Sequence, residues 1–313
     1  MENKNEEKYF HSINNYIIIS ENPFQIAFTQ NKKIIIYEIN LSDLLSFKKQ
    51  KEIEIPDQIL TIGKLNLTND IIVVGKTNKT IYYISSKDNQ IKFSSICNKN
   101  LISLITLNEN NINYLLYADK VGEISIKKIT ENETEESFNK MGKIICGHSD
   151  SITHLNISND KKLLLSCDTF GKLKIYQFPN LFNVLSIIIY HDNDVKFVNF
   201  SGEIDKSLIV FTKNSDVDIW SLYDFQLQKK EKIEDNIIYC NTFNKNNILL
   251  LQSENHILIY SIDNIHFCLS DKKELKYDFN KDNNYIFFNY NNKIYLSIFN
   301  NQNELNKIIL IYE

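Results

Sequence analysis

Three side chains near the middle of the chain, His148, Ser166 and Asp168, are of the types that support nucleophilic catalysis. In a serine hydrolase the histidine takes the proton of the serine hydroxyl, and the carboxylate orients the histidine ring. A serine of the α/β-hydrolase type would also sit in a Gly-x-Ser-x-Gly turn. Ser166 has no glycine at either of the two required positions. We therefore expect these residues to be structural, and we predict that the chain has no catalytic residue and is not an enzyme by itself.

Cofactor and metal chemistries lack their signatures as well. The seven glycines are dispersed and form neither a Gly-x-Gly-x-x-Gly fingerprint nor a P-loop. The six histidines show no metal-ligand spacing. All 35 basic residues are lysines, and 39 acidic residues bring the net charge to -4. We predict no cofactor and no metal, and a nucleic-acid role cannot rest on this charge, although a local face of lysines stays open as an alternative.

The elements that must position these residues repeat along the chain. Seven hairpins each combine an apolar strand, a turn of two or three residues and a second strand with an apolar-x-apolar-large ending. The last residues of the second strands lie 37 to 49 positions apart, a period typical of propellers with four-stranded blades. We predict an all-β, seven-bladed β-propeller in which residues 1–313 form one domain. The second strands are Lys33 to Tyr37, Lys79 to Tyr83, Glu123 to Lys127, Lys172 to Tyr176, Asp216 to Trp220, His256 to Tyr260 and Lys293 to Ser297.

The connecting segments have their own composition. Glycine is scarce, so we expect asparagine to take the turn positions that need positive φ, as in Asn31-Lys32, Asn78-Lys79 and Asn291-Asn292. Residues 130–143 are rich in glutamate and weakly apolar, and we predict an extended acidic surface loop there. We expect the last strand, Lys307 to Tyr312, to close the ring by completing a blade begun at the N-terminus.

We expect an intracellular protein because the sequence shows neither a signal peptide nor a membrane span. The start of the chain, Met1 to Glu7, is charged and does not read as a signal peptide. No apolar run reaches the roughly 18 residues of a membrane span. The five cysteines form no Cys-x-x-Cys pair, so we expect free and mostly buried thiols.

The best-preserved repeat resembles a WD repeat. It opens with Gly147-His148, continues through the strand with Ser166 and the turn with Asp168, and ends in Tyr176 where tryptophan is usual. The resemblance implies that His148, Ser166, Asp168 and Tyr176 form a buried, hydrogen-bonded set. His191 takes the place of His148 one blade later, although Tyr190 replaces the glycine before it.

Residues 117–200 are similar to a narrower family, the non-catalytic WD-repeat subunit of the tRNA (guanine-N(7)-)-methyltransferase. The similarity rests on the turn 118–123, the opening 147–153 and the basic-apolar-basic strand that follows Asp168. It implies a heterodimer in which the catalytic partner binds S-adenosylmethionine and methylates a guanosine of the tRNA variable loop. This chain would support the partner and would contact tRNA mainly through the complex. It would be located in the nucleus and would not associate with a membrane.

In that family the basic-apolar-basic strand contacts the catalytic partner through an ion pair, and the matching residues are Lys172 and Lys174. Strand alternation puts both lysines on one face, with Leu173 and Ile175 on the other. A lysine cannot form the bidentate fork of the arginine that is frequent at the second position. Two alternatives stay open: the lysines only keep an exposed strand soluble, or the chain is a general WD-repeat adaptor of another intracellular complex.

Overall fold

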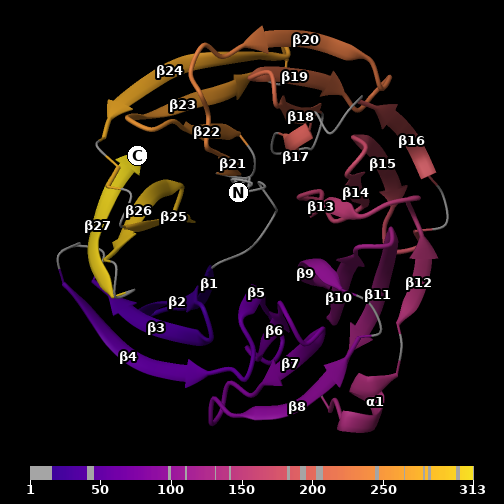
Figure 1. Ribbon diagram of the computed structural model, residues 1–313, viewed down its shortest axis with the longest axis vertical. Coiled ribbons are helices and arrows are strands. Elements are labelled where there is room, and N and C mark those ends of the chain that lie inside the picture. Colours follow the sequence, from indigo (N-terminus) through magenta and orange to yellow (C-terminus); the bar gives the residue numbers. More distant parts are fainter. Residues whose placement is uncertain are drawn as a thin grey trace, which may run out of the picture.

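The computed structural model describes residues 16–40, 46–97, 100–109, 111–130, 132–140, 142–181, 184–190, 195–201, 207–243, 247–263, 265–277, 279–280, 283–300 and 304–312. Its strands form seven antiparallel sheets, six of four strands and one of three. The sheets stand around a central axis as the blades of a ring (Figure 1). The prediction of a seven-bladed β-propeller is confirmed.

Each blade is a meander whose strands follow one another from the centre of the ring to its rim (Figure 1). Blades 1 to 3 contain β1 (Tyr16–Glu21), β2 (Phe24–Gln30), β3 (Lys33–Ile39), β4 (Phe47–Glu54); β5 (Ile59–Lys64), β6 (Ile71–Gly75), β7 (Thr80–Ile84), β8 (Ile91–Ile96); and β9 (Leu101–Glu109), β10 (Ile112–Asp119), β11 (Glu123–Ile129), β12 (Lys143–Cys146). Blades 4 and 5 contain β13 (Ile152–Ile157), β14 (Leu163–Asp168), β15 (Lys172–Gln177), β16 (Val184–Ile189); and β17 (Val195–Ser201), β18 (Ser207–Thr212), β19 (Asp216–Ser221), β20 (Leu227–Lys232). Blades 6 and 7 contain β21 (Tyr239–Phe243), β22 (Ile248–Gln252), β23 (His256–Asp263), β24 (Cys268–Lys276); and β25 (Asn284–Tyr290), β26 (Lys293–Phe299), β27 (Leu305–Tyr312).

The seven hairpins of the sequence are the second and third strands of the six four-stranded blades, beginning with β2–β3, and the pair β25–β26 of the three-stranded last blade. Their turns need left-handed backbone, and Asn31 (φ 52°) and Asn291 (φ 49°) supply it as expected. In two other turns the residue after the asparagine takes this conformation, Lys79 (φ 55°) and Ser215 (φ 62°). Asparagine therefore replaces glycine in only part of these turns.

The core consists of seven apolar clusters, and each cluster lies between two neighbouring blades. Strands such as β14 and β22 are buried on both faces for this reason, which explains their continuous runs of leucine. The outer strands β4 and β20 pair with a neighbouring strand on one side only, and their side chains are mostly charged and exposed.

We expected the last strand to complete a blade begun at the N-terminus, but residues 1–15, on which this depends, lie outside the described residues. The last strand, β27, pairs with β26 of its own blade, and β1 pairs with β2 of the first. Aromatic packing joins blades 7 and 1, with ring centroids 5.0 Å apart for Phe28 and Phe299 and 4.2 Å apart for Phe24 and Tyr290. The backbone N–H of Leu305 also donates to the hydroxyl of Tyr37 at 3.3 Å. Within the described residues, side-chain packing therefore joins blades 7 and 1.

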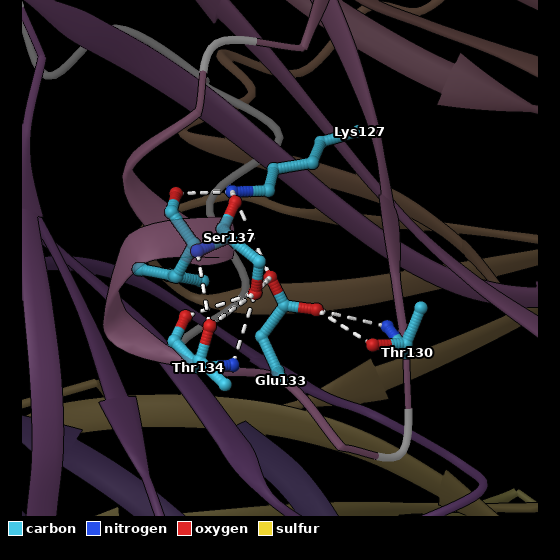
Figure 2. A network of polar contacts seen from close by, with 6 residues as sticks. Lys127, Thr130, Glu133, Thr134 and Ser137 are labelled. Atoms are coloured by element: carbon cyan, nitrogen blue, oxygen red, sulfur yellow. Dashed lines mark hydrogen bonds and ion pairs between the residues drawn. The ribbon is translucent and has the colours of Figure 1, made fainter.

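The segment predicted as an extended acidic loop contains a short helix, α1 (Glu135–Asn139). Thr134 caps its N-terminus, and its hydroxyl and that of Ser137 form a capping box (Figure 2). The ammonium of Lys127 donates to the carbonyls of Ser137 and Phe138 and thereby holds the helix on blade 3. The prediction was wrong at this point because a helix of five residues gives little periodic signal, and because its buried side chain, Phe138, packs against Tyr83 and Phe93 of the neighbouring blade.

Replacing Phe138 by alanine should destabilise the propeller by about 3–5 kcal/mol, the usual cost of emptying a buried phenylalanine site. Phe138 is 3% exposed and lies between Tyr83 and Phe93, at centroid distances of 5.7 and 4.9 Å. Urea unfolding measures the change, with Phe170→Ala, whose side chain is exposed, as the matched control. Equal losses in the two variants would mean that α1 does not contribute to the packing of blades 2 and 3.

Candidate protein-interaction site

Blade 4 brings together three of the residues singled out by type. The Nδ1 atom of His148 lies 2.9 Å from Asp168 Oδ2, and its Nε2 atom lies 2.6 Å from Ser166 Oγ. All three residues are buried. His148 comes from the connection between blades 3 and 4, whereas Ser166 and Asp168 lie on β14. The set thus fastens the connecting segment to the middle of the blade and leaves the serine hydroxyl no access to a substrate.

The hydroxyl of Tyr176 was expected in the same hydrogen-bonded set. It lies near enough to Ser166 for that side chain to lower its pKa, but it makes no hydrogen bond of good geometry within the described residues. The side chain is 1% exposed, and burial, the larger effect, raises its pKa to about 12. Its ring joins the apolar cluster between blades 3 and 4, and its hydroxyl lies against Gly147, where a Cβ atom would come within 2.7 Å of it. Packing is therefore the main constraint on the position of Tyr176.

Asp168 also shapes the turn from β14 to β15. Its Oδ1 atom accepts the backbone N–H groups of Phe170 at 3.0 Å and of Lys172 at 2.9 Å. Burial alone would raise the pKa of this carboxyl group, but the hydrogen bond from His148 and the two backbone donors outweigh burial and lower the pKa. Asp119 repeats the device in blade 3 with the N–H groups of Val121 and Glu123.

Lys172 and Lys174 lie on the face of β15 that is turned towards blade 3, because they alternate with Tyr176, which packs there. Leu173 and Ile175 occupy the other face and pack against blade 5. Both lysines are half-buried. The ammonium of Lys174 donates to the carbonyl oxygen of Gly147, and burial together with the charge of Lys172 lowers its pKa. Lys172 makes no ion pair within the described part of the chain.

The lysine pair does not recur in blade 5, where Asp216 and Asp218 take the matching places. Asp216 forms ion pairs with Lys230 at 2.8 Å and Lys232 at 3.6 Å. Asp218 accepts the hydroxyl of Tyr190 at 2.8 Å. The acidic positions of blade 5 are thus largely neutralised within the blade and its border, whereas the cationic positions of blade 4 are not.

The remaining predictions concern His191, a metal site and a membrane span. His191 lies outside the described residues. Among the residues that are described, no group of three or more histidine, cysteine or acidic side chains could hold a metal ion. Within the same residues, no helix is long and apolar enough to cross a membrane.

Sequence reasoning missed a second group of lysines, on blade 3. Lys128 and Lys143 face blade 4 and line a cavity of about 590 Å³. Strand alternation could have indicated the direction of Lys128, since it follows the apolar Ile124 and Ile126 at even spacing. Lys143 could not be placed in this way because it ends the segment 130–143, which was predicted as a loop although β12 begins at this residue.

The fold and the blade 4 set define a seven-bladed β-propeller with a WD-type fourth blade. No protein-family model matches the chain. Among curated proteins, the tRNA (guanine-N(7)-)-methyltransferase non-catalytic subunit wdr4 of Dictyostelium discoideum is 25% identical over 212 residues. The match covers 63% of this chain and 44% of that protein, so the chain spans less than half the length of the relative it matches.

Asp168→Asn should lower the free energy of unfolding by about 2 kcal/mol near neutral pH, because charge-assisted hydrogen bonds to a buried carboxylate are lost. The pKa of Asp168 is lowered in the folded state, so its stabilisation is present above the unfolded pKa of about 3.9 and fades as the pH falls through the folded value. The difference between wild type and variant should therefore shrink below about pH 4.

Urea unfolding of both proteins across this pH range is the measurement, with Asp271→Asn, at an exposed position, as the control. A difference between wild type and Asp168→Asn that is independent of pH would mean that the carboxylate charge does not stabilise the turn.

Proposed function

We propose that this chain is the non-catalytic WD-repeat subunit that binds and stabilises the catalytic subunit of a tRNA (guanine-N(7)-)-methyltransferase. The observation that carries the proposal is the match to a protein of that name, together with a propeller whose fourth blade has the WD hydrogen-bonded set. The buried serine and histidine of that set favour a structural role over a catalytic one.

The division of labour is the one that the family resemblance implies. S-adenosylmethionine is bound by the catalytic partner, which carries out methylation, and tRNA is held mainly by the complex. The propeller acts by binding one conformation of the partner more tightly than the others, which raises the population of that conformation. We place the complex in the nucleus on the strength of the family resemblance.

Lys172 and Lys174 are the proposed contact with the partner. They lie on one face of β15, and the carbonyl of Gly147 fixes the direction of Lys174. Neither lysine forms an ion pair within the described residues, and the ammonium of Lys172 also lacks the carbonyl contact that Lys174 has, so a carboxylate of the partner would meet Lys172 with little competition. Because the second lysine already has a carbonyl ligand, we assign it mainly the orientation of the site.

Co-expression with a tRNA guanine-N(7) methyltransferase of the same cell should yield a stable complex, and the variant with Lys172→Glu and Lys174→Glu should weaken it by more than about 30-fold. Reversing charges at an interface costs on the order of 2–5 kcal/mol. Affinity is measured with purified chains, and thermal unfolding of the variant shows whether it is folded.

The matched control reverses Lys87 and Lys229, two exposed lysines on other blades. Failure of the wild-type chain to bind any such methyltransferase would leave the general WD-repeat adaptor as the better function. Normal binding by the Lys172 and Lys174 variant would remove blade 4 from the interface while leaving the partner in place.

A further inference from the structure

The border between blades 3 and 4 is lined with lysines from both sides. On blade 3, Lys128 alternates with Ile124 and Ile126, which pack against blade 4, so its side chain is turned the same way. Lys143 pairs with Ile126 across β11 and β12, and its ammonium donates to the carbonyl of Asn180 in blade 4 at 2.8 Å. With Lys172 and Lys174 of blade 4, these two residues form what we call the basic seam.

A cavity of about 590 Å³ opens at the Lys128 and Lys143 end of the basic seam. Tyr114 and Ile126 of blade 3 line it, together with Pro179 of blade 4. The ammonium of Lys128 lies 5.9 Å from the centre of the Tyr114 ring. The cavity therefore combines an apolar floor with cations at its edge, which suits a side chain that carries both a hydrocarbon stem and a carboxylate.

Helix α1 forms one wall of the cavity through Ser137 and Lys140. Two acidic residues next to this wall already have partners. Glu133 accepts the backbone N–H of Thr130 at 3.0 Å and lies 4.0 Å from Lys127 (Figure 2). Glu136 lies 3.4 Å from Lys140. No acidic side chain lines the cavity among the described residues, and Lys128 forms no ion pair with any of them. Among the described residues Lys172 likewise forms no ion pair, whereas the carboxylate of Asp168 acts on Lys174. The charge that a partner can neutralise is therefore mainly that of Lys128 and Lys172.

The two ends of the basic seam are separated by the length of β15. Lys172 begins this strand, and Gln177 ends it just before the Pro179 side of the cavity. Five residue steps of about 3.3 Å give a separation of about 17 Å. Ile187 lies opposite Lys174 on β16 and is 51% exposed, so an apolar side chain borders the row of lysines.

We propose that the basic seam binds an acidic, partly apolar segment of a protein partner, with one carboxylate near Lys172 and a second in the cavity beside Lys128 and Lys143. The cavity is thus a second anchor point, distinct from the Lys172 and Lys174 contact. The proposal rests on the proposed function only in taking this partner to be the methyltransferase. Two anchors about 17 Å apart fix the direction in which the segment lies, which one ion pair cannot do.

The observations favour protein over RNA as the occupant. RNA would use the lysines but gains little from an exposed isoleucine, and the aromatic ring at the cavity, Tyr114, is 5% exposed and offers no face for base stacking. The net charge of -4 acts alike on an acidic peptide and on RNA of equal charge, so the choice rests on the apolar and aromatic surroundings of the lysines.

The first experiment treats the purified complex with a carbodiimide, which joins ammonium and carboxylate groups in direct contact. We expect Lys128 or Lys143 and Lys172 to be joined to two carboxylates of one segment of the partner. If the methyltransferase binds but its links lie on other blades, the second anchor is refuted and the proposed function stands. If the links join the seam to acidic residues of a different partner protein, the second anchor stands and the proposed function fails.

The second experiment needs no known partner. A labelled peptide of glutamate and leucine and a labelled oligouridylate of equal charge are titrated with the wild-type chain and with the Lys128→Glu, Lys143→Glu variant. We expect the peptide to bind and the variant to weaken it at least about fivefold, as two partly exposed ion pairs predict. The Lys87→Glu, Lys229→Glu chain should bind the peptide like the wild type, and thermal unfolding checks that both variants fold. Stronger binding of the oligouridylate than of the peptide, or equal peptide binding by both variants, would overturn the proposal.

Discussion

The packing of apolar side chains between neighbouring blades is the interaction on which the rest of this structure depends. Each of the seven clusters joins residues of two blades, so no blade buries its own faces without its neighbours. The cluster between blades 7 and 1, built around Phe28, Phe288 and Phe299, joins the first and last blades of the ring. Because the stabilisation from burial scales with the apolar area buried, the loss of one cluster would expose the facing sides of two blades at once.

This constraint also determines where a partner can be bound. Middle strands have both faces committed to packing, so function falls to the turns, the outer strands and the margins of the seams. At the margin between blades 3 and 4 the apolar alternation gives way to lysine, at Lys128 on one side and at Lys172 and Lys174 on the other. Blade 5 has aspartates at the matching places but neutralises Asp216 with its own lysines. The border between blades 3 and 4 therefore differs from that of blade 5 in having cationic side chains that are not paired in the same way.

The parts of the fold that were predictable are those encoded locally. Each hairpin has its two strands and its turn within about 20 residues, so all seven can be recognised from the local sequence pattern. The direction of a side chain is less secure, because a shift of one residue moves it to the other face. Tyr37 and Tyr176 pack towards the preceding blade, whereas Tyr83, which ends the matching hairpin pattern of blade 2, packs towards the following one.

The sequence by itself determined the number of blades, the strands of each hairpin and the candidate lysines of β15, because all of these follow from residues close together in the chain. Only the tertiary structure decided that Tyr176 is held mainly by packing, that Phe138 of a short helix packs between blades 2 and 3, and that Lys128 and Lys143 lie at the opposite end of the border between blades 3 and 4 from Lys172. These arrangements depend on contacts between blades. Such contacts are set by how whole sheets pack around the ring, and a linear pattern does not encode which side chains then meet.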